Sequence, residues 1–133
     1  MAKDEIGDFY PEEKLFRAVY KKDLNMFDKT GRITSSVFKS SKGLSVDRQW
    51  YRNIEDVANE LRMRFAKNKD KPPEDFCIIS VTKSDCDEVG VVCVYKPSRN
   101  NEYHAEIHES QTQTKISQSH ARALVLLSKI EIP

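Results

Sequence analysis

Two short runs of apolar residues place the strongest limits on how this chain folds. Residues 76–82 and 91–95 are continuous, rich in β-branched side chains and flanked by turn residues, which is the pattern of buried strands. The further segments that we expect to be extended are residues 14–20, 32–39, 44–46 and 103–109. For residues 12–20 a short helix fits the apolar spacing equally well.

Two other segments have helical spacing. Asn53 is a suitable N-cap, and the apolar stripe that follows it predicts a helix over residues 53–67. Ser117 can cap a second helix over residues 117–129. Residues 83–90 form either a loop or one helical turn capped by Ser84 and ended by Gly90. The last four residues are a short apolar tail that could dock on the domain.

This order of elements predicts an α+β fold. We expect a small mixed or mainly antiparallel sheet with the two main helices packed on one face. With 133 residues, the chain is long enough for one modest core. The predicted organisation is a loose N-terminal leader over residues 1–11 and a single domain over residues 12–133.

Composition argues against several classes of function. The 22 basic and 21 acidic residues give a net charge of +1, so there is no bulk attraction to nucleic acid or to an anionic membrane. The longest apolar run, residues 91–95, is far shorter than the roughly 20 residues that span a bilayer. We see no signal peptide and expect a cytoplasmic protein.

The three cysteines match no zinc signature. Cys77 and Cys93 lie in apolar runs and are interpreted as buried, reduced thiols. Cys86 lies between acidic residues, which raise the pKa of a thiol and disfavour a reactive thiolate. The sequence implies no cofactor.

The segment around His104 is the first candidate site. On a strand, His104, Glu106 and His108 share one face. Residues four apart on a strand lie about 13 Å apart, so the two histidines cannot ligate one metal ion without a kink. We favour a solvated strand face. The alternatives are a catalytic role for His104 or Glu106 and, less favoured, a metal site.

A phosphate site is the second candidate. Ser36, Lys39 and Arg48 lie near glycine-containing turns and could hold a phosphate. No nucleotide or hydrolase motif accompanies them. The simpler interpretation is a hydrogen-bonded loop in which Asp47 and Arg48 form a local ion pair. Arg17 lies in an apolar context, so it either needs a polar partner or points into a cleft.

Four segments together carry a resemblance to a known group of sequences. They are Leu15-Phe16-Arg17, Ser35-Ser36-Val37-Phe38, Gly43-Leu44-Ser45-Val46-Asp47-Arg48 and Tyr103-His104-Ala105-Glu106-Ile107. Together they resemble a family of short uncharacterised prokaryotic proteins. The resemblance implies a stand-alone cytoplasmic protein and brings no activity with it.

Two functions are compatible with these observations. The first is a binding or accessory protein of a prokaryotic system, such as a conflict or toxin–antitoxin system, with a protein partner. The alternative is a small enzyme that acts on RNA, a nucleotide or NAD. In that enzyme His104, Glu106 and Arg17 would be catalytic, and Ser36, Lys39 and Arg48 would bind phosphate. The sequence does not determine the oligomeric state.

Overall fold

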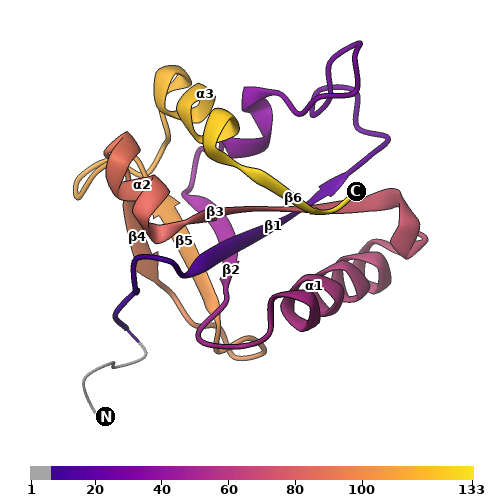
Figure 1. Ribbon diagram of the computed structural model, residues 1–133, viewed down its shortest axis with the longest axis horizontal. Coiled ribbons are helices and arrows are strands. Elements are labelled where there is room, and N and C mark those ends of the chain that lie inside the picture. Colours follow the sequence, from indigo (N-terminus) through magenta and orange to yellow (C-terminus); the bar gives the residue numbers. More distant parts are fainter. Residues whose placement is uncertain (1–6) are drawn as a thin grey trace.

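The computed structural model describes residues 7–133, and in this part of the chain the sheet has six strands in the order β4-β5-β2-β1-β3-β6. The strands are β1 (Lys14–Tyr20), β2 (Leu44–Arg48), β3 (Phe76–Thr82), β4 (Val92–Tyr95), β5 (His104–His108) and β6 (Lys129–Ile132). The helices are α1 (Ile54–Lys69), α2 (Lys83–Val89) and α3 (Gln118–Leu127), with short 3-10 helices η1 (Ser35–Phe38) and η2 (Pro73–Asp75). Every strand pairing is antiparallel, so the predicted α+β class is confirmed (Figure 1).

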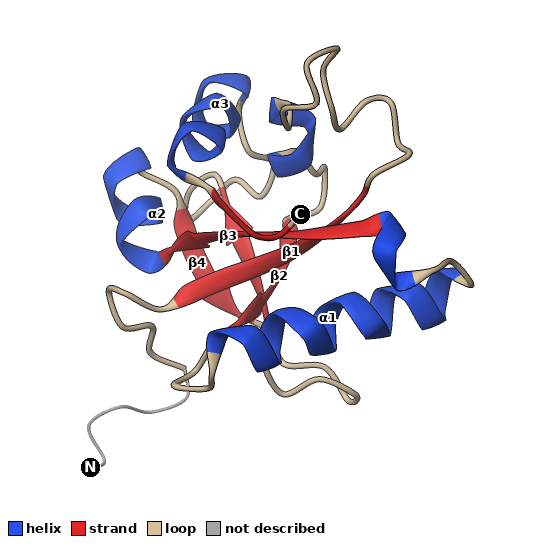
Figure 2. Cartoon of the chain, turned by 45° about the vertical axis from the view of Figure 1, so that its right-hand side comes forward, coloured by secondary structure: helices blue, strands red, loops and turns tan. Residues whose placement is uncertain are grey.

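Helices cover both faces of the sheet, whereas we expected the two main helices on one face. α1 packs on the face that carries Phe16 and Ile78, while α2, α3 and η1 lie on the other side (Figures 1 and 2). The reason lies in β3. Its side chains alternate between the two faces, and six of its seven residues are buried. A central strand that is apolar on both sides requires cover on both sides.

The expected strand over residues 32–39 is wrong. Residues 35–38 form η1, which begins where Thr34 Oγ1 accepts a hydrogen bond from the backbone N–H of Ser36. The adjacent residues Val37 and Phe38 are both buried in the same core cluster. A strand would send them to opposite faces, so the need to bury both outweighs the period-2 pattern of the segment.

Local capping explains the segments that the sequence left open. Residues 83–89 form α2, and its cap is Thr82 rather than Ser84, with Asp85 completing a capping box. Gly90 ends the helix at φ 98°, where a residue without Cβ is favoured. The C-terminal tail does more than dock, because β6 pairs with β3 as an edge strand.

Only part of the expected leader, residues 1–11, lies within the described residues, and that part contacts the domain. The carbonyl oxygen of Asp8 accepts a hydrogen bond of 2.7 Å from Arg48 Nη2. The ring of Phe9 lies 4.0 Å from the guanidinium carbon of Arg48, and Tyr10 stacks on Tyr51 with 4.1 Å between ring centroids. Packing of the domain therefore includes residues 8–10.

A buried ion pair joins Glu13, the residue before β1, to the end of β2. Arg48 Nε and Nη2 donate to the two carboxylate oxygens of Glu13 at 2.8 and 2.9 Å, and neither side chain has any exposed surface. Glu13 also accepts the backbone N–H of Trp50 at 2.9 Å. Because the pair has two parallel hydrogen bonds, it fixes the orientation of the guanidinium relative to the carboxylate as well as the distance between them. It therefore holds the first residues of the domain against the turn that follows β2.

Glu13→Gln should lower the free energy of unfolding by about 3 kcal/mol, because it removes the negative charge that faces a fully buried guanidinium. The double variant Glu13→Gln with Arg48→Met should lose less unfolding free energy than the two single variants lose in sum. Urea denaturation measures both effects. Lys83→Ala, at the solvent-facing ion pair with Asp87, is the control and should change stability by less than about 0.5 kcal/mol. A loss below 1 kcal/mol for Glu13→Gln would contradict this account.

Candidate ligand-binding cleft

β1 and β2 are joined over only a short ladder. Their register pairs Leu15 with Arg48 and Phe16 with Asp47. By contrast, β1 pairs with β3 at seven positions and β2 pairs with β5 at four. The sheet therefore consists of two halves, β4-β5-β2 and β1-β3-β6, and β1 and β2 diverge beyond Phe16 (Figure 1).

Arg17 is the first residue of β1 beyond this ladder. Its Nη1 donates a hydrogen bond of 2.6 Å to the carbonyl oxygen of Ser45, so the side chain bridges the two strands where their backbones separate. Its Nε is buried and has no hydrogen-bond partner, and no carboxylate in residues 7–133 pairs with the guanidinium. Burial lowers the pKa of Arg17 to about 10, because the charged form loses water without gaining a counter-ion.

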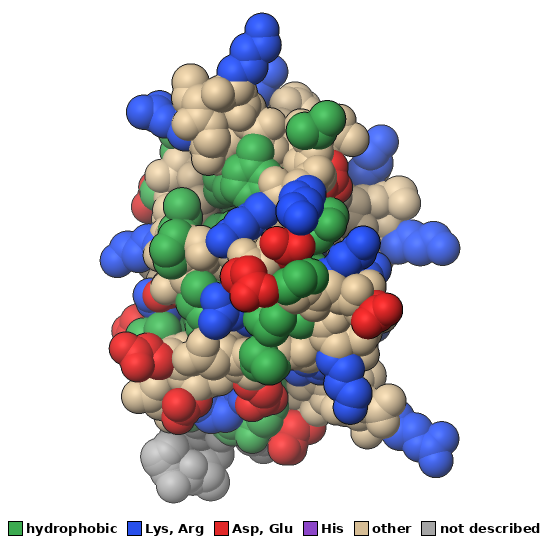
Figure 3. All heavy atoms as spheres, turned by 90° about the vertical axis from the view of Figure 1, so that its right-hand side faces the viewer, with side chains coloured by type: hydrophobic (Ala, Val, Ile, Leu, Met, Phe, Trp, Pro, Cys, Tyr) green, Lys and Arg blue, Asp and Glu red, His purple; other side chains and the backbone are tan. Residues whose placement is uncertain are grey.

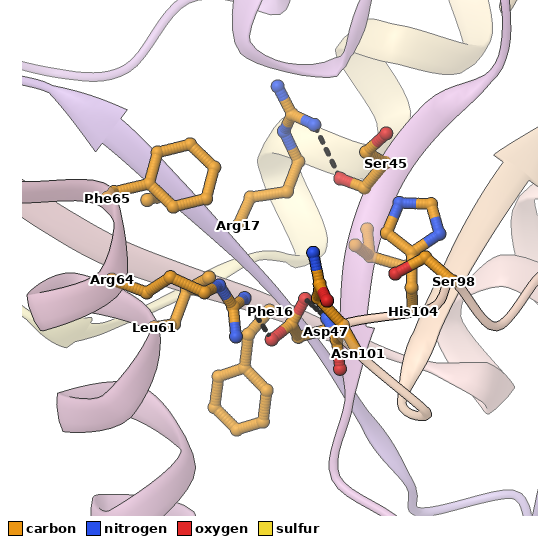
Figure 4. Close-up of a pocket in the computed structure, with 13 residues that line it drawn as sticks. Phe16, Arg17, Ser45, Asp47, Leu61, Arg64, Phe65, Ser98, Asn101 and His104 are labelled. Carbon is orange, nitrogen blue, oxygen red and sulfur yellow. Dashed lines mark hydrogen bonds and ion pairs between the residues drawn. The ribbon is translucent and has the colours of Figure 1, made fainter. Parts of the chain in front are cut away.

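A cavity of about 340 Å³ opens at the split, between α1, β1, β2, β5 and the loop that joins β4 to β5 (Figure 4). We call it the Arg17 cleft. It is lined by Phe16, Arg17, Ala18, Ser45, Val46, Asp47, Leu61, Arg64, Phe65, Ser98, Asn100, Asn101 and His104. Arg17 and His104, which the sequence analysis singled out separately, therefore share one cavity.

The carboxylate of Asp47 is already neutralised within the cleft. Arg64 Nη2 donates to Oδ2 at 2.5 Å, and Asn101 Nδ2 donates to Oδ1 at 3.0 Å. Strand alternation puts Asp47 on the α1 face and Arg48 on the other, so Asp47 pairs with Arg64 rather than in the expected local pair with Arg48. The pair leaves Arg17 as the cleft's arginine without a counter-charge.

His104 lies beside Asp47 in the register of β5 and β2. Its Nδ1 lies 2.8 Å from the carbonyl oxygen of Lys96. A carbonyl can only accept, so Nδ1 carries the proton and the neutral ring keeps its lone pair on Nε2. His104 can thus offer one acceptor to a ligand.

Glu106 is not among the residues that line the cleft. Its Oε1 lies 2.7 Å from His108 Nε2 and 4.0 Å from Lys96 Nζ. β5 places positions 104, 106 and 108 on one face, as alternation predicts, but Glu106 is engaged by His108 and not by His104. Both side chains lie against Gly43, where a Cβ would stand 2.5 Å from Glu106 Oε1 and 2.9 Å from His108 Nε2.

The three residues considered for phosphate binding have separate environments. Arg48 is buried against Glu13, with no surface to offer a ligand. Lys39 is exposed and its amino group donates to the side chain of Gln118 on α3. Ser36 lies in η1, where its backbone N–H completes the cap by Thr34. The structure thus places Arg48 in the core, where it has no exposed surface for the phosphate contact that was considered as an alternative.

Sequence reasoning missed several polar residues of the cleft. Arg64 follows Leu61 by three residues, a spacing that places it beside the buried stripe of α1 and could have identified it. Ser98, Asn100 and Asn101 lie in a loop whose sequence shows only turn-forming residues. No sequence pattern could have placed that loop over β2.

The cysteines are free thiols. Cys77 and Cys86 are buried and Cys93 is partly buried. A hydrogen bond with Cys93 together with burial raises the pKa of Cys86, and burial raises the pKa of Cys77. These directions disfavour the thiolate form at both positions.

Three further observations bear on the kind of site. On the face in Figure 3, basic and acidic side chains lie next to one another and to apolar ones. Among residues 7–133, no group of three or more His, Cys, Asp or Glu is arranged to hold a metal ion. The helices of this same range are too short or too polar to cross a bilayer.

No family model, no curated protein and no solved structure matches this chain.

Gly43→Ala should lower the free energy of unfolding by about 2–3 kcal/mol, because it combines a left-handed backbone at φ 91° with a clash against Glu106 and His108. Gly31→Ala is a matched control, since Gly31 has φ 83° but no neighbour within 4 Å. It should cost only about 1 kcal/mol, from backbone strain alone. Urea denaturation measures both, and equal losses would show that the close approach at Gly43 is unimportant.

Arg17→Met should raise the free energy of unfolding by about 1 kcal/mol at pH 7. The folded pKa of about 10 lies below the ordinary value of 12.5, so the penalty for burying the charge is fully present below pH 10 and is relieved as the pH rises from there. Urea denaturation at pH 7 measures the gain. Arg122→Met, on exposed α3 surface, should be neutral. A loss of stability for Arg17→Met would mean that its bond to Ser45 outweighs the cost of burial.

Proposed function

We propose that this protein is a binding module that holds the anionic group of a ligand at Arg17. The single observation that carries the proposal is a partly buried guanidinium that lines a cavity and lacks a counter-ion in residues 7–133. Native proteins pair or satisfy nearly all buried polar groups, so an unpaired one beside a cavity calls for a partner from outside the chain. An anion supplies that partner.

The other ionisable groups favour binding over catalysis. Acid–base chemistry needs a carboxylate or imidazole within reach of a reacting group. Both carboxylate oxygens of Asp47 are occupied, and Glu106 is bound to His108 outside the cleft. His104 alone offers a free acceptor, and no partner in the cleft activates or orients it beyond the carbonyl of Lys96.

The biological setting rests on the family resemblance. It supports the proposal of an accessory role in a prokaryotic system, with a protein partner and a cytoplasmic location. Anion binding in the Arg17 cleft is compatible with that role, because a bound ligand can stabilise a domain whose sheet halves meet over a short ladder.

The proposal is tested with two minimal anions, acetate and inorganic phosphate, added to isotope-labelled protein at pH 7 and constant ionic strength. We expect at least one of them to shift the Nε–H resonance of Arg17 and the amide resonance of Ser45 in a saturable manner. Arg17→Met should abolish the shift of Ser45, because it removes the cation and keeps an unbranched side chain in its place.

Two variants serve as controls for general charge effects. Arg62 also has a buried, unpaired Nε but does not line the cleft, and Arg122 is exposed on α3. Arg62→Met and Arg122→Met should both retain the shift of Ser45. If neither anion shifts Ser45, or if Arg17→Met leaves the response unchanged, the cleft is not an anion site.

A further inference from the structure

We propose that the ligand of the Arg17 cleft is a small monocarboxylate with an apolar or aromatic body, its carboxylate on Arg17 and its body against Phe65 and Ala18. This inference rests on the proposed function, since it names the chemical class of the anion that Arg17 holds. It is argued from the charge, the donors and the walls of the cleft.

The charge within the cleft matches a monoanion. Arg64 and Asp47 neutralise each other across 2.5 Å, which leaves one positive charge, on Arg17, without a counter-charge. A phosphate dianion would bring a second negative charge into the cavity that also holds Asp47. Like charges close together in a partly dehydrated site repel strongly, so one negative charge is the better match.

The available donors also fit a carboxylate. A guanidinium has five N–H donors, and Arg17 uses one of them, toward the Ser45 carbonyl. The planar fork that remains is suited to the two oxygens of a carboxylate. A phosphate is held most often by several cations or by a cluster of backbone N–H groups. Two arginines line this cleft, but Arg64 is already paired with Asp47, which leaves Arg17 alone to hold the anion.

The walls of the cleft are apolar where the ligand's body would lie. Phe65 and Ala18 are partly buried and line the cavity together with Arg17, and the buried Phe16 and Leu61 line it as well. Figure 4 labels Phe65, Phe16 and Leu61 around Arg17. The ring of Phe65 is fixed by an edge contact with Phe76, with 6.3 Å between centroids. A volume of about 340 Å³ is at the small end of ligand pockets. A body the size of one aromatic ring therefore fits.

The test compares benzoate, acetate, inorganic phosphate and the uncharged analogue benzamide, each titrated into the whole protein while the amide resonances of Ser45 and Asn101 are followed. We expect benzoate to bind at least tenfold more tightly than acetate, phosphate or benzamide. Arg17→Met should abolish benzoate binding, and Arg122→Met should leave it unchanged.

Phe65 supplies a second, independent readout. Phe65→Ala should reduce benzoate affinity to that of acetate and leave acetate itself unaffected, because only benzoate uses the ring contact. Phe65→Leu keeps an apolar side chain of nearer size than alanine and should weaken benzoate binding about threefold, so it serves as the test if the alanine variant does not fold.

The outcomes separate the two proposals. Binding of phosphate more tightly than benzoate, lost in Arg17→Met, would overturn the carboxylate inference and leave the anion site standing. Equal affinity for benzoate and benzamide would overturn it as well, because Arg17 would then contribute nothing. The absence of any response to all four compounds would overturn both proposals.

Discussion

The buried ion pair between Glu13 and Arg48 is the interaction on which the rest of the structure depends. β1 and β2 share only two residue pairs, and this ion pair lies beside them and ties both strands to the turn at Trp50. The two halves of the sheet are thus fastened at one end. At the other end they are free to diverge, and the divergence creates the cavity. The buried ion pair and the Arg17 cleft therefore arise from the same arrangement of the two strands.

Arg17 is the first residue of β1 that no longer pairs with β2. Its side chain reaches across the gap to the carbonyl of Ser45 and replaces the backbone ladder with a single bond. This is a costly way to fill a gap, because a guanidinium loses its water and finds no carboxylate in residues 7–133. An apolar side chain would fill the same space without that cost. An arginine whose buried Nε is unpaired and which lines a cavity is the reason for proposing a ligand at this site.

Much of the fold follows from local patterns in the sequence. The stripe after Asn53 and the apolar run at residues 76–82 predict α1 and β3, because both elements are set by their own periodicity. The prediction of a strand over residues 32–39 is wrong, since burial of both Val37 and Phe38 in one core cluster overrides the strand pattern. The site is harder to predict than the fold. Arg17 was recognised as an arginine that needs a partner or a cleft, but Arg48 looks equally suited to phosphate until Glu13 is seen beside it.

The central claim is that Arg17 is a partly buried cation without a counter-ion in residues 7–133, and its pKa in the free protein tests that claim most directly. The chemical shifts of the guanidinium carbon and Nε of Arg17 can be followed by NMR between pH 8 and pH 12. Our account predicts a midpoint of about 10, lowered from the ordinary value of 12.5 by burial. A guanidinium that shows no titration in this range would be solvated or paired, and the cleft would then have no unmatched charge to offer a ligand.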